Sequence, residues 1–427
     1  MMEVKNANLT KNSKLRGFFS QIPLLAWIIG GLIAVWLEHL AGDRLTDILM
    51  LPKIPVLFGF VTMLKKPLLI PSSVIYVLLI YLLPVFIFAR LTRSPLNKLA
   101  AALFKVPWLS AVIHIVLFYA ILHIWADISA YRVLTLRLTL VAVILTLSLN
   151  LINGYMGEFS CSHPGFMALG AYMASVLSLV LFVSDRHFGE AVLPAISGPF
   201  LFHLVLIGGG IAAALGALVI AVPSFRTRGD YLAIISLAFM FIVKSMIENM
   251  EFLRGPRGLS GQPDYATLPV VFTWTVLCVW TINNFVRSTL GKALNAVRDD
   301  EMAADAMTVN TRQTKMVAFM FGAFWAGVAG GLFAHVLRYV NPGTFSIQKL
   351  AEVLAMVYFG GLNSVYGSIV GAVSLSLLGE ALRPLEIFKW IIIPLLLILV
   401  MIYRPTGLIA FKEFNVRNLI RPKQEPE

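Results

Sequence analysis

The chain has 427 residues, of which 59% are hydrophobic and 13% charged, and its mean hydropathy is +0.84. Soluble domains are roughly 45–50% apolar, so this composition excludes an ordinary soluble domain and indicates a membrane protein. The net charge of +12 would suit nucleic-acid binding in a soluble protein, but in a membrane protein it is typical of Lys and Arg kept in cytoplasmic loops. We therefore expect membrane lipid around the chain and no nucleic-acid partner.

The predicted elements are eleven apolar runs, most of them about as long as a helix that crosses a bilayer. Backbone polar groups inside lipid must be satisfied within each segment, and the alternation of a membrane β-barrel is absent, so the runs are predicted to be helices. The expected fold class is all-α, a polytopic transmembrane helical bundle with about 10–12 spans. In chain order the runs are 22–41, 68–88, 109–126, 133–153, 164–183, 200–222, 231–247, 268–286, 316–337, 350–382 and 385–403.

The distribution of basic residues predicts the orientation of these spans. The connection 90–105 carries four basic residues and no acid, and five basic residues follow position 403 in the C-terminal tail. Cytoplasmic N- and C-termini require an even number of crossings, because positive residues resist translocation. We therefore expect the tenth run, which contains "FGGLNSVYGS" (359–368), to be broken near 360–363 into two short or re-entrant pieces.

Two segments around glycine-rich turns have a similar sequence pattern, which suggests a pseudo-repeat. "NLINGYMGEFSCSHPGFMALGAYMASVL" (150–177) and "AMVYFGGLNSVYGSIVGAVSLSLL" (355–378) both place a turn before a helix of small residues. Transporters are often built from repeats whose broken helices approach the substrate route. The alternative is that Gly and Ala only allow helices to pack closely, and the two readings stay open.

No motif of enzyme chemistry is present. The "GK" at Gly291–Lys292 is not a phosphate-binding P-loop, because Val286 and Ala293 occupy the positions that need Gly and Ser/Thr. Cys161 and Cys278 have no partner at metal-ligand spacing, so we expect no metal, no cofactor and no disulfide framework. The charged residues nearest the broken segments, which are the best candidates for a water-filled route, are His163, Glu158, Glu352 and Glu380.

One compact charged segment, "GKALNAVRDDEMAADAMTVN" (291–310), separates two long apolar stretches. It is rich in Ala and lacks Gly and Pro after its first residue, so it predicts a short helical element at the membrane surface that docks on a soluble partner. An ordinary solvated loop is the alternative.

Five ordered motifs resemble the LivM-type permease subunits of branched-chain amino acid ABC importers, over roughly residues 133 to 408. Besides 291–310 they are "GYMGEFSCSHPGFMALGAY" (154–172), "RGDYLAIISLAF" (228–239), "GPRGLSGQP" (255–263) and "YFGGLNSVYGSIVGA" (358–372). The resemblance implies a subunit of the bacterial inner membrane without its own nucleotide-binding site. Its implied partners are a related LivH-like permease, two cytoplasmic ABC ATPase subunits and a periplasmic or extracytoplasmic substrate-binding protein.

The resemblance also divides the chain and suggests functional residues. It implies an N-terminal extension at 1–130 with about three transmembrane helices, an ABC importer permease core at 131–408 and a cytoplasmic basic tail at 409–427. An ATPase-coupling loop is implied at Gly291, Lys292, Arg298, Asp299, Asp300, Glu301 and Ala304. A candidate translocation path is implied at Gly154, Gly157, Glu158, His163, Gly360, Gly361 and Asn363.

The chain departs from the family pattern in its turns. Glu158 replaces the usual Gln, Cys161 and Ser162 replace Leu and Gly, and Asn363 stands at a usual Gly. The coupling loop ends in Met307, Thr308 and Val309 before Asn310 instead of a Leu-Gly-Ile-Asn run. Branched-chain amino acids are the expected substrates, with urea, short amides or another amino acid as alternatives. An ion-coupled secondary transporter is a less favoured alternative.

Overall fold

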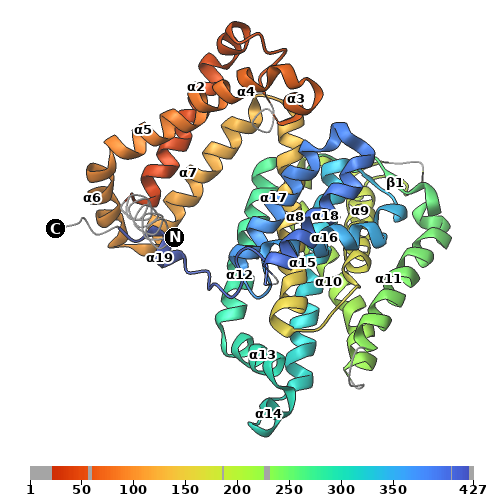
Figure 1. The fold of residues 1–427 in the computed structure, drawn as a ribbon. Helices are drawn as coiled ribbons and strands as arrows, with labels where there is room; N and C mark the ends of the chain where they lie inside the picture. Colours follow the sequence, from red (N-terminus) through yellow and green to blue (C-terminus); the bar gives the residue numbers. More distant parts are fainter. Residues whose placement is uncertain (1–21, 56–59, 185–186, 226–230, 405, 423–427) are drawn as a thin grey trace. The chain divides into compact units, whose positions relative to one another are not determined.

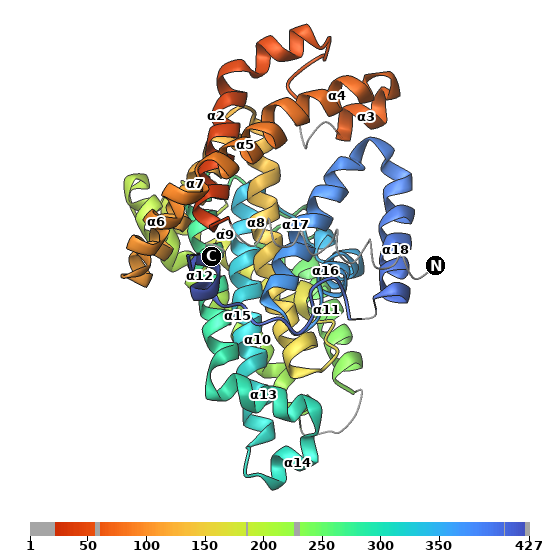
Figure 2. The ribbon, with the colours of Figure 1, turned by 60° about the vertical axis from the view of Figure 1, so that its left-hand side comes forward.

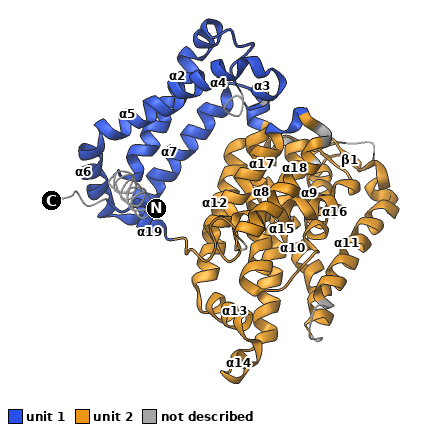
Figure 3. Cartoon of the chain, viewed as in Figure 1, with its two compact units in different colours: residues 1–133, 381–384, 415–427 blue, residues 134–380, 385–414 orange. Residues whose placement is uncertain are grey.

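The computed structural model describes residues 22–55, 60–184, 187–225, 231–404 and 406–422. The basic N-terminal segment and the start of the "RGDYLAIISLAF" motif, including Arg228, lie outside the described residues. The chain divides into two compact units, one of residues 1–133, 381–384 and 415–427 and the other of residues 134–380 and 385–414 (Figure 3).

The first unit is a set of apolar helices. The rod from Pro67 to Leu91 contains a π-helical segment, because Pro84 has no amide hydrogen to continue the α-helical ladder. Apart from short 3-10 turns, the helices are α2 (Leu24–Ile48), α3 (Phe60–Lys65), α4 (Ile70–Val77), η3 (Leu78–Leu82), α5 (Leu83–Leu91), α6 (Arg93–Phe104), α7 (Pro107–Asp127) and α19 (Val416–Ile420) (Figure 1).

A buried ion pair holds this first unit together. The Arg132 guanidinium donates to both carboxylate oxygens of Glu38, at 2.9 and 3.0 Å, and the two side chains are 1% and 0% exposed. The hydroxyls of Tyr76 and Tyr81 donate to the same carboxylate. A buried charge is costly unless it is paired and hydrogen-bonded, and here helices α2, α4 and η3 supply the partners that Arg132 and Glu38 need.

The second unit is a helical bundle with one short two-stranded sheet, in which Leu259 pairs with Val340. Its helices are α8 (Ala130–Asn150), η4 (Leu151–Met156), α9 (His163–Phe182), α10 (Gly198–Ser224), α11 (Tyr231–Asn249), α12 (Leu268–Arg287), α13 (Thr289–Asp299), α14 (Glu301–Ala306), α15 (Thr311–Leu337), α16 (Ile347–Gly360), α17 (Val365–Ala381) and α18 (Glu386–Tyr403). The first four residues of α8 and the last residue of α17 are counted in the first unit. The strands are β1 (Leu259–Ser260) and β2 (Tyr339–Val340).

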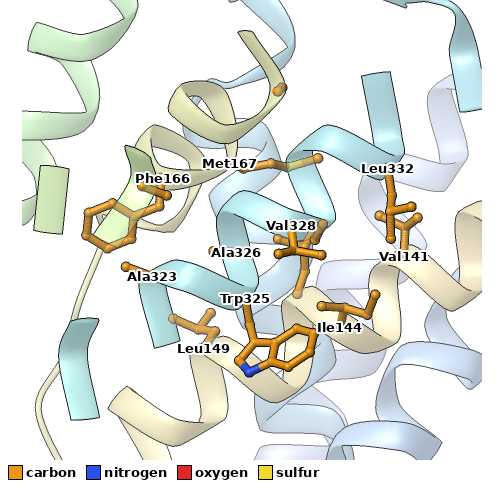
Figure 4. Packing of buried hydrophobic residues seen from close by; sticks show 14 of the residues in the cluster. Val141, Ile144, Leu149, Phe166, Met167, Ala323, Trp325, Ala326, Val328 and Leu332 are labelled. Atoms are coloured by element: carbon orange, nitrogen blue, oxygen red, sulfur yellow. The ribbon is translucent and has the colours of Figure 1, made fainter. Parts of the chain in front are cut away.

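The core of the second unit lies where α9, α10 and α15 pack together (Figure 2). A methyl group on Gly170 would lie 2.2 Å from the Gly327 carbonyl oxygen, so only glycine lets α9 and α15 approach so closely. Large side chains, among them Phe166, Met167 and Trp325, belong to the buried core of this unit (Figure 4). The small residues that gave α9 its repeat-like pattern therefore have a packing role.

Nine helices among the described residues are long and apolar enough to cross a membrane, and 365–381 and 391–403 are shorter apolar helices. The predicted fold class, a polytopic helical bundle, is confirmed. The predicted break in the tenth run is also confirmed, because α16 ends at Gly360 and α17 begins at Val365. Gly361 and Asn363 form this break with positive φ angles of 126° and 54°, which favour Gly and Asn.

Candidate functional site

The charged segment 291–310 forms two short helices at one end of the second unit, α13 and α14, rather than an ordinary loop (Figures 1 and 2). Capping side chains explain its boundaries. Ser288 Oγ accepts from Gly291 N, Asp300 Oδ1 accepts from Ala303 N at 2.9 Å, and Asn310 Oδ1 accepts from Gln313 N at 3.0 Å. Three caps within 23 residues fix where each helix begins, since unpaired amides at a helix start need acceptors.

The two faces of this helical pair differ. Gly291, Leu294 and Val297 are buried, whereas Lys292 and the acids 299–301 are exposed. Ala304, expected in the coupling loop, is only 5% exposed. Two exposed apolar side chains that the sequence analysis did not select are Met302 and Met307, with 74% and 77% exposed.

Helix α13 packs against the first glycine-rich turn. Gly157 ends η4 with a φ of 76°, and a methyl group there would lie 2.4 Å from Arg298 Cγ. Arg298 also donates to Asp299 at 2.7 Å and lies over the Phe411 ring at 5.7 Å. The turn is therefore in direct contact with the predicted coupling loop, which the sequence alone did not indicate.

A lysine joins the same turn to α14. The Lys315 ammonium donates to Glu158 Oε1 at 2.7 Å and to Glu301 Oε2 at 2.8 Å. The Lys315 side chain is 9% exposed, that of Glu158 26% and that of Glu301 51%. Glu158, expected in the translocation path, and Glu301, expected in the coupling loop, thus share one cation that the sequence analysis did not select.

The two glycine-rich turns meet at Asn150. Its Oδ1 accepts from Asn363 N at 3.2 Å, and its Nδ2 donates to Ser368 Oγ at 2.7 Å and to the Ser364 carbonyl at 3.1 Å. A methyl group on Gly154 would lie 2.0 Å from the Asn150 Oδ1 atom and 2.6 Å from Asn363 N. Gly154 and Asn363 therefore lie together.

The other predicted path residues lie in closed surroundings. The His163 ring is 1% exposed, packs edge-on against Phe166, and makes no hydrogen bond of good geometry within the described part of the chain. Gly360 lies against the Gly367 carbonyl and Gly361 against Ile409. The Ile409 amide donates to the Gly360 carbonyl at 2.9 Å, so these glycines let the segment after α18 pack back on the break.

Two further ionisable residues, Glu352 and Cys161, show no reactive arrangement. Glu352 accepts from Lys349 on its own helix at 3.0 Å. Burial raises the pKa of the Cys161 thiol, although the neighbouring Ser236 hydroxyl opposes this shift, so the thiol stays protonated at neutral pH.

Comparisons with known proteins agree with this architecture. The family model described as branched-chain amino acid transport system / permease component matches residues 131–402. The permease protein LivM of Escherichia coli, from a high-affinity branched-chain amino acid transport system, is 30% identical over 307 residues, which are 64% of this chain and 68% of LivM.

Other permeases show the same relationship. LivH of Escherichia coli is 24% identical over 63% of this chain and 91% of its own length, and BraD of Pseudomonas aeruginosa is 30% identical over 38% of this chain and 54% of BraD. No solved structure matches the chain. The family match covers more than half of the chain and confirms the resemblance seen in the ordered motifs. The chain therefore belongs to the family of permease components of branched-chain amino acid transport systems.

Proposed function

We propose that this chain is the membrane-spanning subunit of an ABC importer and forms half of the path by which branched-chain amino acids enter the cell. The LivM relatives and the matched family are named for that transport, which supports the proposal. In this proposal the chain has no nucleotide-binding site of its own. A LivH-like permease completes the path, two cytoplasmic ATPases supply the energy, and an extracytoplasmic binding protein delivers the substrate.

The proposed location is the bacterial inner membrane, with both termini cytoplasmic. The basic connection 90–105 and the basic tail support this orientation. The contact between Arg298 and Phe411 gives further support, because it joins α13 to the segment that follows α18. That segment and the coupling helices then share the cytoplasmic side.

The single observation that carries the proposal is the contact between the two sets of predicted functional residues. Helices α13 and α14 present exposed acids and two exposed methionines outward, which suits docking into a groove on an ATPase. Arg298 of α13 touches the turn at Gly157, and Lys315 of α15 links Glu301 of α14 to Glu158 of the same turn. A helical pair with one face for a soluble partner and the other on a turn of the bundle is suited to pass motion between them.

The path itself is proposed to run between the turn 154–163 and the break at 360–363. Asn150 ties the two together, and the closed surroundings of His163 then correspond to a state in which the path is shut. Proton or sodium coupling is less well supported, because Glu158, its best candidate, already forms an ion pair with Lys315.

Cross-linking and uptake test this proposal. Cysteines at Asn295 and Met302 should cross-link to an ATPase that co-purifies with the chain and should react with impermeant thiol reagents only from the cytoplasmic side. Met302 is exposed and suits this experiment, whereas a cysteine at the buried Ala304 would not be accessible. Labelling from the periplasmic side, or a purified complex without an ATPase, would contradict the proposal.

Competition identifies the substrate. Uptake of radiolabelled leucine by membrane vesicles that contain the assembled complex should be inhibited by isoleucine and valine and not by urea or short amides. Inhibition by urea or acetamide instead would assign the transporter to those solutes and keep the importer architecture.

A further inference from the structure

Lys315 is a largely buried cation that contacts the first glycine-rich turn, residues 154–163, through Glu158. It is the fifth residue of α15, yet its side chain is 9% exposed and its ammonium contacts two carboxylates from different segments. Glu158 belongs to the glycine-rich turn and Glu301 to the first turn of α14. No other cation in the described part of the second unit forms ion pairs with both segments.

We propose that Lys315 is the positioning residue that makes the glycine-rich turn move together with the coupling helices, so that ATP-driven movement of α14 reaches the translocation path. This inference rests on the proposed function. Lys315 acts through its two carboxylate partners.

The physical reason is the cost of leaving a poorly solvated ammonium without partners. Pairing with two carboxylates at 2.7 and 2.8 Å offsets that cost, and separating either carboxylate from Lys315 brings part of it back. The turn, the start of α15 and the start of α14 are therefore held as one group. Any displacement of α14 that preserves these contacts carries Glu158 with it.

A second contact joins α13 to the same turn. The aliphatic part of Arg298 fills the space beside Gly157, where any side chain would displace it. Helix α13 also packs on both η4 and α15. Energetic coupling between distant sites travels through such packed and hydrogen-bonded chains when they have discrete arrangements.

The test compares leucine uptake with ATP hydrolysis in the assembled transporter. Complexes that carry Lys315→Met, Lys315→Arg or no change are reconstituted in vesicles, and uptake of radiolabelled leucine and ATP hydrolysis are measured on the same samples. We expect Lys315→Met to assemble in normal yield and to hydrolyse ATP, while its leucine uptake per ATP hydrolysed falls about 10-fold, within the usual range of coupling between sites. Lys315→Arg, which keeps the charge, should retain at least about half of the wild-type ratio.

A double-mutant cycle separates this link from a general loss of charge. Glu158→Gln should lower the ratio in the same direction, and Glu158→Gln combined with Lys315→Met should be no worse than Lys315→Met alone. Lys244→Met is the matched control, because Lys244 also pairs with a glutamate, Glu248 at 3.7 Å, but on its own helix α11. It should keep the wild-type ratio.

The outcomes are distinct. If Lys315→Met keeps the wild-type ratio, or if uptake and hydrolysis fall together in proportion to lost complex, Lys315 is a structural contact only and the inference is wrong. If Lys315→Met fails to assemble, Glu301→Gln decides, because it leaves the pair with Glu158 in place; an unchanged ratio in Glu301→Gln then refutes the inference. Failure of the proposed function has a different signature, since the wild-type complex itself would then hydrolyse no ATP or import no leucine.

Discussion

Among the ion pairs that join distant residues in the described part of the chain, Arg132–Glu38 and Lys315–Glu158 differ in how firmly they are built. Arg132 and Glu38 are 94 positions apart, lie almost fully out of solvent and have two tyrosine hydroxyls as further partners. Lys315 and Glu158 are 157 positions apart, and Glu158 and the second carboxylate, Glu301, remain partly exposed. The first pair is suited to hold helices in place and the second to join elements that move. Burial and number of partners, rather than ion pairing alone, separate a structural contact from a candidate for coupling.

The largest effect is expected when the first pair is broken. In Glu38→Gln the Arg132 charge stays buried without its carboxylate, which should cost about 3–5 kcal/mol in the free energy of unfolding of the first unit. Thermal unfolding of the detergent-solubilised protein and its yield in membranes measure this loss.

Removing both charges at once tests whether the unpaired Arg132 charge causes the loss of stability in Glu38→Gln. Glu38→Leu combined with Arg132→Met should recover much of the lost stability, because no uncompensated charge remains. A double variant that is as unstable as the sum of its single variants would show that the pair is not the reason. Lys315→Met, by contrast, should change transport far more than it changes the unfolding temperature.

An intermediate effect is expected at the contact between the turn and α13. Gly157→Ala places a methyl group in a left-handed backbone conformation and against Arg298, at a cost of about 1–2 kcal/mol. We expect lower leucine uptake per ATP hydrolysed together with a modest fall in thermal stability. Gly189→Ala is the control for backbone strain, since Gly189 also has a positive φ but no atom within 4 Å of the added methyl. An equal loss of uptake in Gly189→Ala would contradict a specific role for the contact at Gly157.

The smallest effect is expected at an ordinary pair on one helix. Lys244 and Glu248 are four positions apart on α11, and their side chains are 29% and 35% exposed. Glu248→Gln should change the free energy of unfolding by less than about 1 kcal/mol, as exposed pairs usually do. If Glu248→Gln lowered the free energy of unfolding as much as Glu38→Gln, the exposure of an ion pair would not predict its contribution to stability.

The sequence by itself determined the helices and their breaks, because these depend on neighbouring residues. Apolar runs located the spans, the Ala-rich charged segment became α13 and α14, and the glycines before Asn363 placed the end of α16. Local composition carries this information, since a span needs a continuous apolar stretch and a break needs residues that accept positive φ.

Only the tertiary structure decided which of these elements touch. Lys315 looked like a loop residue before an apolar helix, and nothing near it in the chain marks Glu158 as its partner. Asn150, inside an apolar run, and Arg132, just before the same run, were equally inconspicuous, and Ala304 was expected to face a partner but is buried. The physical reason is that ion pairs and hydrogen bonds between distant residues depend on how the helices pack, and helical periodicity records which face of a helix is apolar but not which helix lies against it.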